Sequence, residues 1–189
     1  MFVCISGASG SGKSAIIDGV LQKFGDKIAL LPSSTTRSIR PGEIPGKIYF
    51  YITVDEFKKA IENGEFIEYE QVHSNGNYYG VSRIRYDEYS KHYPILIKDV
   101  DVKGTQSIKR AGIDTLTIYI DVKTEELKKR LTVRGDSLNE IELRLARKEF
   151  EDSFKNKYDY IIENTNLNDA IEKTAKIIKS EAKKRKILL

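Results

Sequence analysis

Residues 7–14 read GASGSGKS and match G-x-x-x-x-G-K-[ST], the pattern of a phosphate-binding loop. They lie between a predicted strand at Phe2–Ser6 and a predicted helix at Lys13–Phe24, which is the context that the motif requires. Glycines let successive backbone N–H groups turn toward one anion, Lys13 bridges the outer phosphates, and Ser14 can hold Mg²⁺. The predicted nucleoside triphosphate site comprises Gly7, Ala8, Ser9, Gly10, Ser11, Gly12, Lys13 and Ser14.

Two carboxylates follow the hydrophobic strand predicted within residues 94–102, PILIKDVDV. Asp99 ends the apolar run, and Asp101 lies on the same face two residues later. Because ligands bind at the carboxyl ends of parallel strands, we predict that Asp99 orients Mg²⁺ and its waters beside the phosphate loop. For either aspartate, a purely structural role in capping a loop is the alternative.

Residues 33–50, SSTTRSIRPGEIPGKIYF, combine four hydroxyl residues, two arginines and a tyrosine in a stretch too rich in proline and glycine for one regular element. Guanidinium groups pair bidentately with phosphate oxygens, and tyrosine hydroxyls add neutral donors. Arg37, Arg40 and Tyr49 are therefore candidates for an anion clamp. A solvated pair of arginines in a polar loop is the alternative interpretation.

The charged segment at residues 125–154 is rich in helix-forming residues and carries Arg130, Arg134, Arg144 and Arg147. Transfer of a phosphoryl group requires stabilisation of charge on its equatorial oxygens, and arginines on a closing lid supply it while excluding water. Without further information, such arginines more often form a solvated helix face.

The distribution of apolar residues predicts an α/β core. Residues 94–102 and Leu116–Val122 are apolar and β-branched like buried parallel strands, and Gly104–Ala111 is a candidate crossover helix between them. A last strand at Tyr158–Glu163 precedes a helix that begins near Leu167. The alternation of strands and helices indicates a doubly wound parallel sheet.

An insertion interrupts this core. Residues 28–93 read as short β-prone pieces such as IYFYI and EFIEYEQV, with a brief helix near Asp55–Asn63. The fold class predicted for the whole chain is therefore α/β, with a parallel P-loop core, an inserted mainly antiparallel β subdomain and a helical segment that could serve as a lid.

Composition limits the classes of function. The length of 189 residues suits one α/β domain with inserted subdomains, and the net charge of +4 is weak support for a polyanionic partner. The basic residues 179–186 fit a solvated helix end, so no nucleic-acid partner is expected. No apolar run reaches the roughly 18 residues of a membrane span, and the start MFVCISG does not resemble a signal peptide. Together with the lone Cys4, these features predict a cytoplasmic protein without a membrane partner.

The motif S-S-T-T-R-x-x-R-P-G-E-x-x-G-x-x-Y-x-F closely resembles the monophosphate-binding segment of guanylate kinases. The resemblance continues in the family's order through FIEYEQV, NYYG, DVDVKG, LKKRLTVRG, ELRLARKE and YDYIIEN, over nearly the whole chain. It implies an ATP-binding core at about residues 1–32, 94–125 and 155–189, a monophosphate-binding subdomain at about residues 33–93, and a lid at about residues 126–154.

The same resemblance implies roles for individual residues. A carboxylate suits guanine, because the N1–H and N2 amine are adjacent donors that one acceptor can take together. The implied GMP-binding residues are Ser33, Arg37, Arg40, Tyr49, Glu68, Tyr79, Ser82 and Asp101. The residues implied to join the loop in binding ATP are Arg130, Arg134 and Asn164, of which Asn164 could equally cap the final helix. The implied catalytic residues are Lys13, Arg37, Arg134 and Arg144, and the implied metal ligands are Ser14 and Asp99.

The chain departs from the family pattern at several positions. Val81 stands where the family usually has a small hydroxyl residue that helps to hold the base. An apparent extra residue in HSNGNYYG, near Asn75, could shift the loop and bring Ser82 into the site. Lys98 replaces an apolar strand residue, so it must pair or reach solvent, because an unpaired buried charge is costly. Arg147 replaces a small residue, and the loop lacks the usual prolines between its two arginines.

The leading hypothesis is transfer of the γ-phosphoryl group of ATP to GMP, and to dGMP, with Mg²⁺ as cofactor, by a monomer or homodimer. One alternative is a kinase of the same fold that acts on ribose bisphosphate or another purine monophosphate. A different class is the guanylate-kinase-like binding module of scaffold proteins. Such modules typically lack a working phosphate loop, whereas this chain has Lys13 and Ser14.

Overall fold

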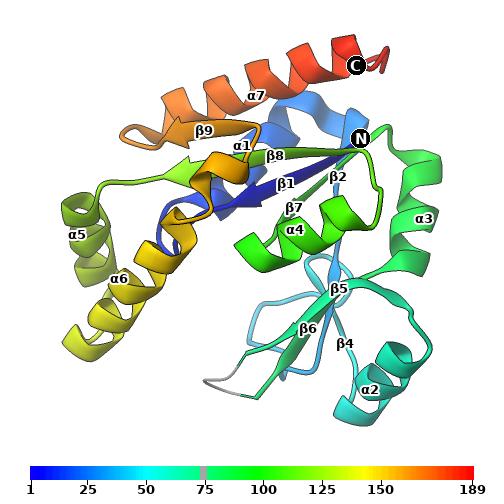
Figure 1. The fold of residues 1–189 in the computed structure, drawn as a ribbon, viewed down its shortest axis with the longest axis horizontal. Coiled ribbons are helices and arrows are strands. Elements are labelled where there is room, and N and C mark those ends of the chain that lie inside the picture. Colours follow the sequence, from blue (N-terminus) through cyan, green and yellow to red (C-terminus); the bar gives the residue numbers. More distant parts are fainter. Residues whose placement is uncertain (73–75) are drawn as a thin grey trace.

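A computed structural model describes residues 1–72 and 76–189 and shows an α/β fold with two separate sheets (Figure 1). The larger sheet is entirely parallel, as predicted. Its strands lie side by side in the order β2 (Ile28–Leu30), β7 (Ile95–Asp99), β1 (Phe2–Ser6), β8 (Thr115–Asp121) and β9 (Tyr160–Glu163). The order reverses on either side of β1, so the loops after β1 and β7 meet at a topological switch point.

Helices cover both faces of this sheet, which confirms the doubly wound prediction. Alternate side chains of β1 point to opposite faces: Val3 and Ile5 pack toward α1 (Lys13–Phe24) and α7 (Leu167–Lys184). The other residues of β1 pack with the face that carries α4 (Val102–Arg110). Every residue of β1 is buried, and this double burial is why its sequence is continuously apolar.

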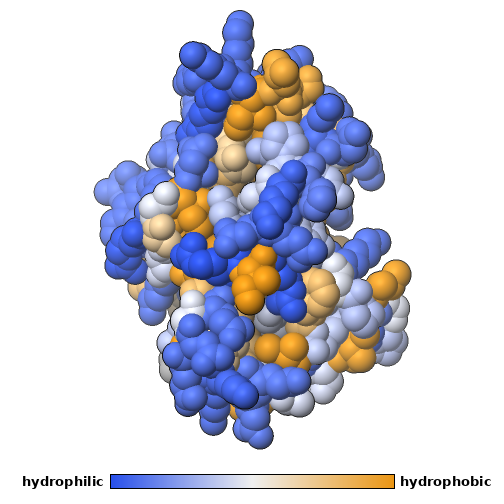
Figure 2. Space-filling model, turned by 90° about the vertical axis from the view of Figure 1, so that its right-hand side faces the viewer, coloured by the Kyte–Doolittle hydropathy of each residue, from blue (hydrophilic) through white to orange (hydrophobic). Residues whose placement is uncertain are grey.

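Helix α3 (Arg83–His92) was not predicted: the interpretation of residues 28–93 as short β-prone pieces with one brief helix near Asp55–Asn63 was wrong at residues 83–92. The sequence RIRYDEYSKH has no apolar stripe, and Ile84 is 62% exposed. The helix is placed by contacts of Tyr86 and Tyr89 with the core, which no periodic pattern announces. Figure 2, which views the molecule from the α3 side of Figure 1, shows a largely hydrophilic face with small separate apolar patches.

The smaller sheet forms the predicted insertion. Its strands lie in the order β4 (Tyr49–Tyr51), β3 (Ser33–Thr35), β6 (Tyr78–Ser82) and β5 (Phe66–Gln71). Pairing is antiparallel between β3 and β6 and between β5 and β6, and parallel between β3 and β4, so the sheet is mixed. Helix α2 (Val54–Glu62) begins at a capping box formed by Thr53 and Glu56.

The predicted lid region consists of α5 (Thr124–Arg134) and α6 (Leu138–Asp152). Gly135 ends α5 in a left-handed conformation, and a capping box of Ser137 and Glu140 begins α6. Short 3₁₀ turns at Gly25–Lys27 and Lys155–Lys157 complete the regular structure. Among the described residues, none of the helices has the length and hydropathy of a membrane span.

An aromatic cluster forms the core of the smaller sheet. Phe57 of α2 is fully buried and stacks on Phe66 with ring centroids 4.3 Å apart, and the ring of Tyr78 lies 5.2 Å away. Gly80 makes room for these rings, because a Cβ there would lie 2.8 Å from Phe66. The insertion thus has an apolar centre of its own.

Substitution of Phe57 by alanine should lower the free energy of unfolding by about 3–5 kcal/mol, because it leaves a cavity in this cluster. Urea denaturation followed by circular dichroism measures the change. Lys58→Ala, one residue away on the exposed side of α2, is the control and should change it by less than about 0.5 kcal/mol. Equal losses in both variants would contradict the assignment of Phe57 as the centre of the cluster.

Candidate active site

The phosphate loop connects β1 to α1 and depends on glycines at defined positions. Gly7, Gly10 and Gly12 have φ angles of 140°, 92° and 94°. A Cβ at Gly7 would lie 2.3 Å from the carbonyl oxygen of Ile120, so only glycine fits there. Lys13 begins α1, and its Nζ donates to the carbonyl oxygens of Gly7 and Ala8 at 2.7 and 3.1 Å. The ammonium group therefore lies over the loop.

A cavity of about 640 Å³ opens in front of this loop, and four cationic side chains line it together with three carboxylates. Arginines from the two lid helices close its far side. The lining residues are Gly7, Ser9, Gly10, Gly12, Lys13, Ser14, Ala15, Asp99, Val100, Asp101, Arg134, Arg144, Arg147 and Glu151. A polyphosphate is the ligand class that such a lining favours.

The lid arginines are held before any ligand binds. Asp136 accepts from Nε of Arg134 at 2.7 Å and lies 2.7 Å from Nε of Arg144. A second contact joins the lid to the loop, because Nη1 of Arg144 donates to Oγ of Ser9 at 2.7 Å. The pKa of Asp136 is lowered, first by its hydrogen bond from Arg134. One carboxylate between the α5 and α6 segments therefore positions both arginines.

Two residues predicted at the ATP site lie behind the loop and do not line the cavity. Nδ2 of Asn164 donates to the carbonyl oxygen of Ser11 at 2.7 Å, and Nη2 of Arg130 donates to the carbonyl oxygen of Asn164 at 2.8 Å. These contacts brace the phosphate loop. The alternative role of Asn164, as cap of the final helix, is wrong: the side chain of Asn166 caps α7.

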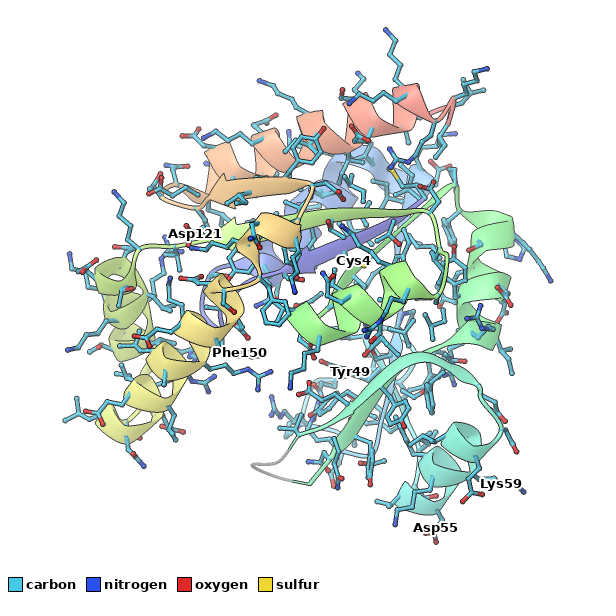
Figure 3. The ribbon with its side chains drawn as sticks, viewed as in Figure 1. Cys4, Tyr49, Asp55, Lys59, Asp121 and Phe150 are labelled. Carbon is cyan, nitrogen blue, oxygen red and sulfur yellow. The ribbon has the colours of Figure 1, made fainter. Side chains whose placement is uncertain are left out.

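A second cavity, of about 300 Å³, lies between the parallel core and the smaller sheet. The lining residues that the sequence predicted are Ser33, Tyr49, Glu68, Tyr79 and Asp101, which come from five separate segments of the chain. In Figure 3 the labelled Tyr49 lies in the smaller sheet, on the side of α4 away from Cys4 of β1. The two cavities adjoin each other, because they share the lining residues Ser14, Asp99, Val100 and Asp101.

The two loop arginines are not lining residues of the second cavity. Arg37 forms a bidentate pair with Glu43, at 3.0 and 2.8 Å, and its guanidinium carbon lies 5.4 Å from the ring centre of Tyr49. Tyr51 also donates to Glu43, at 2.8 Å, and so does the backbone N–H of Arg40, at 2.7 Å. The hydrogen bond from Arg37 is the first cause that lowers the pKa of Glu43 to about 2.

Glu43 was missed as a site residue. It stands directly after Pro41 and Gly42 in RPGE, but nothing in that spacing shows that its carboxylate organises both arginines. The structure thus brings Arg37 beside Tyr49 and leaves the exposed Arg40 joined to the same carboxylate through its backbone.

Carboxylates crowd the other wall of the second cavity. Burial is the main cause that raises the pKa of Glu68 to about 7; Asp101 adds to the shift, and Lys98 opposes it. Glu70 shares a hydrogen bond with Asp101, which raises the pKa of Glu70 to about 7. Glu70 was not predicted in the site, although it follows Glu68 by two residues on a strand and so faces the same side.

Asp101 has two roles. Its Oδ1 caps α4 by accepting from the backbone N–H groups of Lys103 and Gly104 at 2.7 and 2.8 Å, and the side chain also lines both cavities. The sequence left open that this aspartate only caps a loop; in the structure it caps a helix and also has a place in the site. Figure 3 shows Phe150 of α6 facing α4, and Nζ of Lys103 lies 5.4 Å from its ring centre.

Asp99 and Ser14 are the candidate residues for binding Mg²⁺. The Asp99 side chain is 47% exposed where the two cavities meet, and it lies 4.0 Å from Nζ of Lys13. In residues 1–72 and 76–189, no cluster of three or more His, Cys, Asp or Glu could hold a metal alone. Mg²⁺ usually takes one or two carboxylates together with substrate phosphates and water, so the donor set fits.

Ser82 does not line the predicted acceptor site. It is buried at the end of β6, and its hydroxyl accepts from the backbone N–H of Arg85 at 3.5 Å as the cap of α3. Val81 is fully buried and pairs with Glu68 in the sheet. The suggested extra residue near Asn75 lies outside the described residues.

The fold and the two cavities define a P-loop kinase that acts on a small phosphorylated acceptor: a phosphate loop and a lid on one side, and a β-rich pocket on the other. Comparison with known proteins identifies the family of this kinase. The family model of guanylate kinase matches residues 1–181, so the chain belongs to the guanylate kinase family.

Relatives and solved structures agree. The chain is 37% identical to the guanylate kinase of Thermotoga maritima over 182 residues, which cover 95% of this chain and 86% of that protein. It is 40% identical to the guanylate kinase of Sulfurimonas denitrificans over 182 residues, with the same coverage. The crystal structure of guanylate kinase from Anaplasma phagocytophilum superposes with a TM-score of 0.70 at 26% identity, covering 96% of this chain and 85% of that chain.

Removal of the Ser82 hydroxyl distinguishes between two roles for it, a helix cap and a contact with the acceptor nucleotide. Ser82→Ala should lower the free energy of unfolding by about 1 kcal/mol, the usual cost of an N-cap, and leave the KM for the acceptor nucleotide unchanged. Ser180→Ala, at an exposed position of α7, is the control for stability. A large rise in KM without loss of stability would return Ser82 to the binding site.

Proposed function

We propose that the protein transfers the γ-phosphoryl group of ATP to GMP and dGMP, giving ADP and the corresponding diphosphate. The observation that carries the proposal is the junction of the two cavities at Ser14, Asp99 and Asp101. A cation-lined cavity on a phosphate loop meets a carboxylate-lined cavity there, so a donor and an acceptor can react in contact. Membership of the guanylate kinase family supports the same reaction.

The donor side binds the triphosphate and neutralises charge. The loop N–H groups and Lys13 hold the outer phosphates, while Arg134 and Arg144 approach from the lid. An oxygen of the acceptor phosphate attacks the γ-phosphorus, and the bond from that phosphorus to the β-phosphate bridging oxygen breaks. Because charge spreads over the equatorial oxygens in the transition state, positioned cations supply most of the stabilisation.

On the acceptor side, Arg37, Arg40, Tyr49 and Tyr79 bind the GMP phosphate. The contact of Arg37 with the ring of Tyr49, which does line the cavity, supports this role, and the bidentate pair with Glu43 holds the guanidinium beside that ring. Because Arg37 itself is not a lining residue, it would have to turn toward the cavity to reach the phosphate.

The base would be read by Glu68, with Ser33 and Asp101 beside it. Ionised Glu68 accepts from N1–H and the N2 amine of guanine, and adenine offers no such pair of donors. A buried polar group that loses its partner is costly, so the pocket rejects adenine by several kcal/mol. The pocket lining includes no group assigned to the sugar, and dGMP is proposed as a second acceptor on that ground.

Magnesium completes the proposed donor site. Ser14 and Asp99 would hold it, and when bound it supplies positive charge to the β- and γ-phosphate oxygens. The protein's own residues orient the donor, align the acceptor oxygen and exclude water when the lid closes.

The proposed active form is a monomer or a homodimer. A cytoplasmic location is proposed with it, because Cys4 is a buried free thiol and the protein consumes ATP.

The alternative functions would require different residues in the two cavities. A kinase for ribose bisphosphate would not need buried carboxylates such as Glu68 in the acceptor cavity. A non-catalytic binding module would not need Lys13 over a complete phosphate loop with arginines facing it. Release of ADP, measured separately with GMP, dGMP, AMP, IMP and ribose bisphosphate, distinguishes them. Turnover limited to GMP and dGMP supports the proposal, turnover of another acceptor replaces it, and no turnover with any favours the module.

Lys13→Ala should lower kcat by about 10³-fold or more, because it removes a cation that acts on the transferred phosphoryl group. Lys23→Ala, a surface lysine at the other end of α1 paired with Glu172, is the control and should retain activity. Circular dichroism verifies that both variants fold. Near wild-type turnover in a folded Lys13→Ala protein would refute the role of the loop.

The base contact predicts a pH dependence. Because the pKa of Glu68 is raised to about 7, acidification protonates it, and kcat/KM for GMP should fall up to tenfold per pH unit below that value. Glu68→Gln should lower kcat/KM for GMP by about 10²-fold and remove this acid limb.

Glu70→Gln is the matched control, because it removes a neighbouring carboxyl group whose pKa is also raised to about 7. It should keep the acid limb. If the acid limb disappears in Glu70→Gln and persists in Glu68→Gln, the titrating group is Glu70, and the assignment of the base contact to Glu68 is wrong.

A further inference from the structure

Lys98 is an unusual residue for the centre of a parallel sheet. It lies on β7 opposite Cys4 of β1, in a strand whose first three residues are apolar, and only 6% of its surface is exposed. Removing an ammonium group from water is costly unless acceptors surround it. Its presence at this depth therefore requires a chemical reason.

The ammonium group has one protein hydrogen bond. Nζ donates to the carbonyl oxygen of Leu31 at 3.0 Å, and no described carboxylate lies within ion-pairing distance of it. An ammonium has three donors, so two are left for other partners. The side chain also lines the acceptor cavity, together with Glu68 and Asp99.

The amine of Lys98 thus has spare hydrogen-bond donors at the wall of a cavity sized for a small molecule. The carboxylates of Glu68 of β5 and Asp99 of β7 line the same cavity.

We propose that Lys98 is a base-reading residue of this pocket, which donates a hydrogen bond to the 6-oxo group of the purine. The inference rests on the proposed function, because it assigns a further specificity determinant to the same acceptor site. The class of ligand is a 6-oxopurine nucleoside monophosphate.

The edge of guanine that carries O6 needs both a donor and an acceptor from the protein. Guanine presents an acceptor, O6, next to two donors, N1–H and the N2 amine. Lys98 and Glu68 both line the cavity, and they offer a donor and an acceptor respectively. Adenine reverses both positions with an N6 amine and an unprotonated N1, so the pair would oppose it at two atoms.

The last two residues of β6 do not offer that donor. Val81 is apolar and fully buried, and its backbone N–H is already used by Glu68. The hydroxyl of Ser82 caps α3. Lys98 therefore adds an amine donor from the parallel sheet to the hydroxyl groups that Ser33, Tyr49 and Tyr79 of the smaller sheet contribute to the lining.

A purely structural role is the competing explanation. In that case Lys98 would only offset the charge of Glu68 and hold the chain at Leu31, and its loss would weaken all acceptors alike. A substrate analogue distinguishes the two roles. In 6-thio-GMP the oxygen is replaced by sulfur, a much weaker acceptor, while N1–H and the N2 amine remain.

The experiment compares kcat/KM for GMP and 6-thio-GMP in wild type and in Lys98→Met, whose side chain has a similar length and no charge. Wild type should prefer GMP by about 10- to 100-fold, the range of a hydrogen bond from a charged donor. In Lys98→Met the preference should fall to near unity, mainly through the loss of GMP turnover, and the KM for ATP should not change.

Lys148→Met is the matched control, because Lys148 is also 6% exposed but pairs with Asp152 in the lid. It should keep the preference for GMP. If Lys98→Met does not fold, the wild-type ratio still decides: equal use of GMP and 6-thio-GMP overturns the proposal.

The outcomes separate this inference from the proposed function. Wild type without any GMP turnover refutes the function itself. Wild type that turns over GMP, together with a Lys98→Met protein that keeps the full preference over 6-thio-GMP, refutes only the role of Lys98.

Discussion

The burial of β1 on both faces is the constraint on which the rest of the structure depends. A strand that lies between β7 and β8 and beneath helices on each side has no freedom to shift, so its carboxyl end is a fixed point. The phosphate loop leaves from that end, and Asp99 leaves from the end of the neighbouring strand. Parallel strands bring all these ends to one edge, where the two cavities meet.

Several arginines around the two cavities form local ion pairs with carboxylates. Arg37 is paired with Glu43, and Asp136 joins Arg134 to Arg144. Each pair lets a cation remain in place near an anion site without repelling its neighbours. Side chains that are held in position by such pairs require less reorganisation when the phosphoryl group is transferred.

Much of the fold followed from local patterns. The strand at Phe2–Ser6 and the helix at Lys13–Phe24 have the predicted bounds, since apolar periodicity and the glycine loop act within a few residues. Helix α3 did not follow, because its position depends on two tyrosines that contact the core. The parallel pairing of β3 with β4 is likewise a long-range choice, which brings Ser33 beside Tyr49.

By itself, the sequence determined the phosphate loop, the alternating strands and helices of the parallel core, and which residue types could bind anions or guanine. Glycine conformations, buried apolar runs and donor and acceptor groups are local properties, so they can be read along the chain. Only the tertiary structure decided that Glu43 holds Arg37, that Ser82 caps a helix and that Lys98 turns into the acceptor cavity. Those outcomes depend on which segments meet in space, and such contacts leave no periodic signal in the sequence.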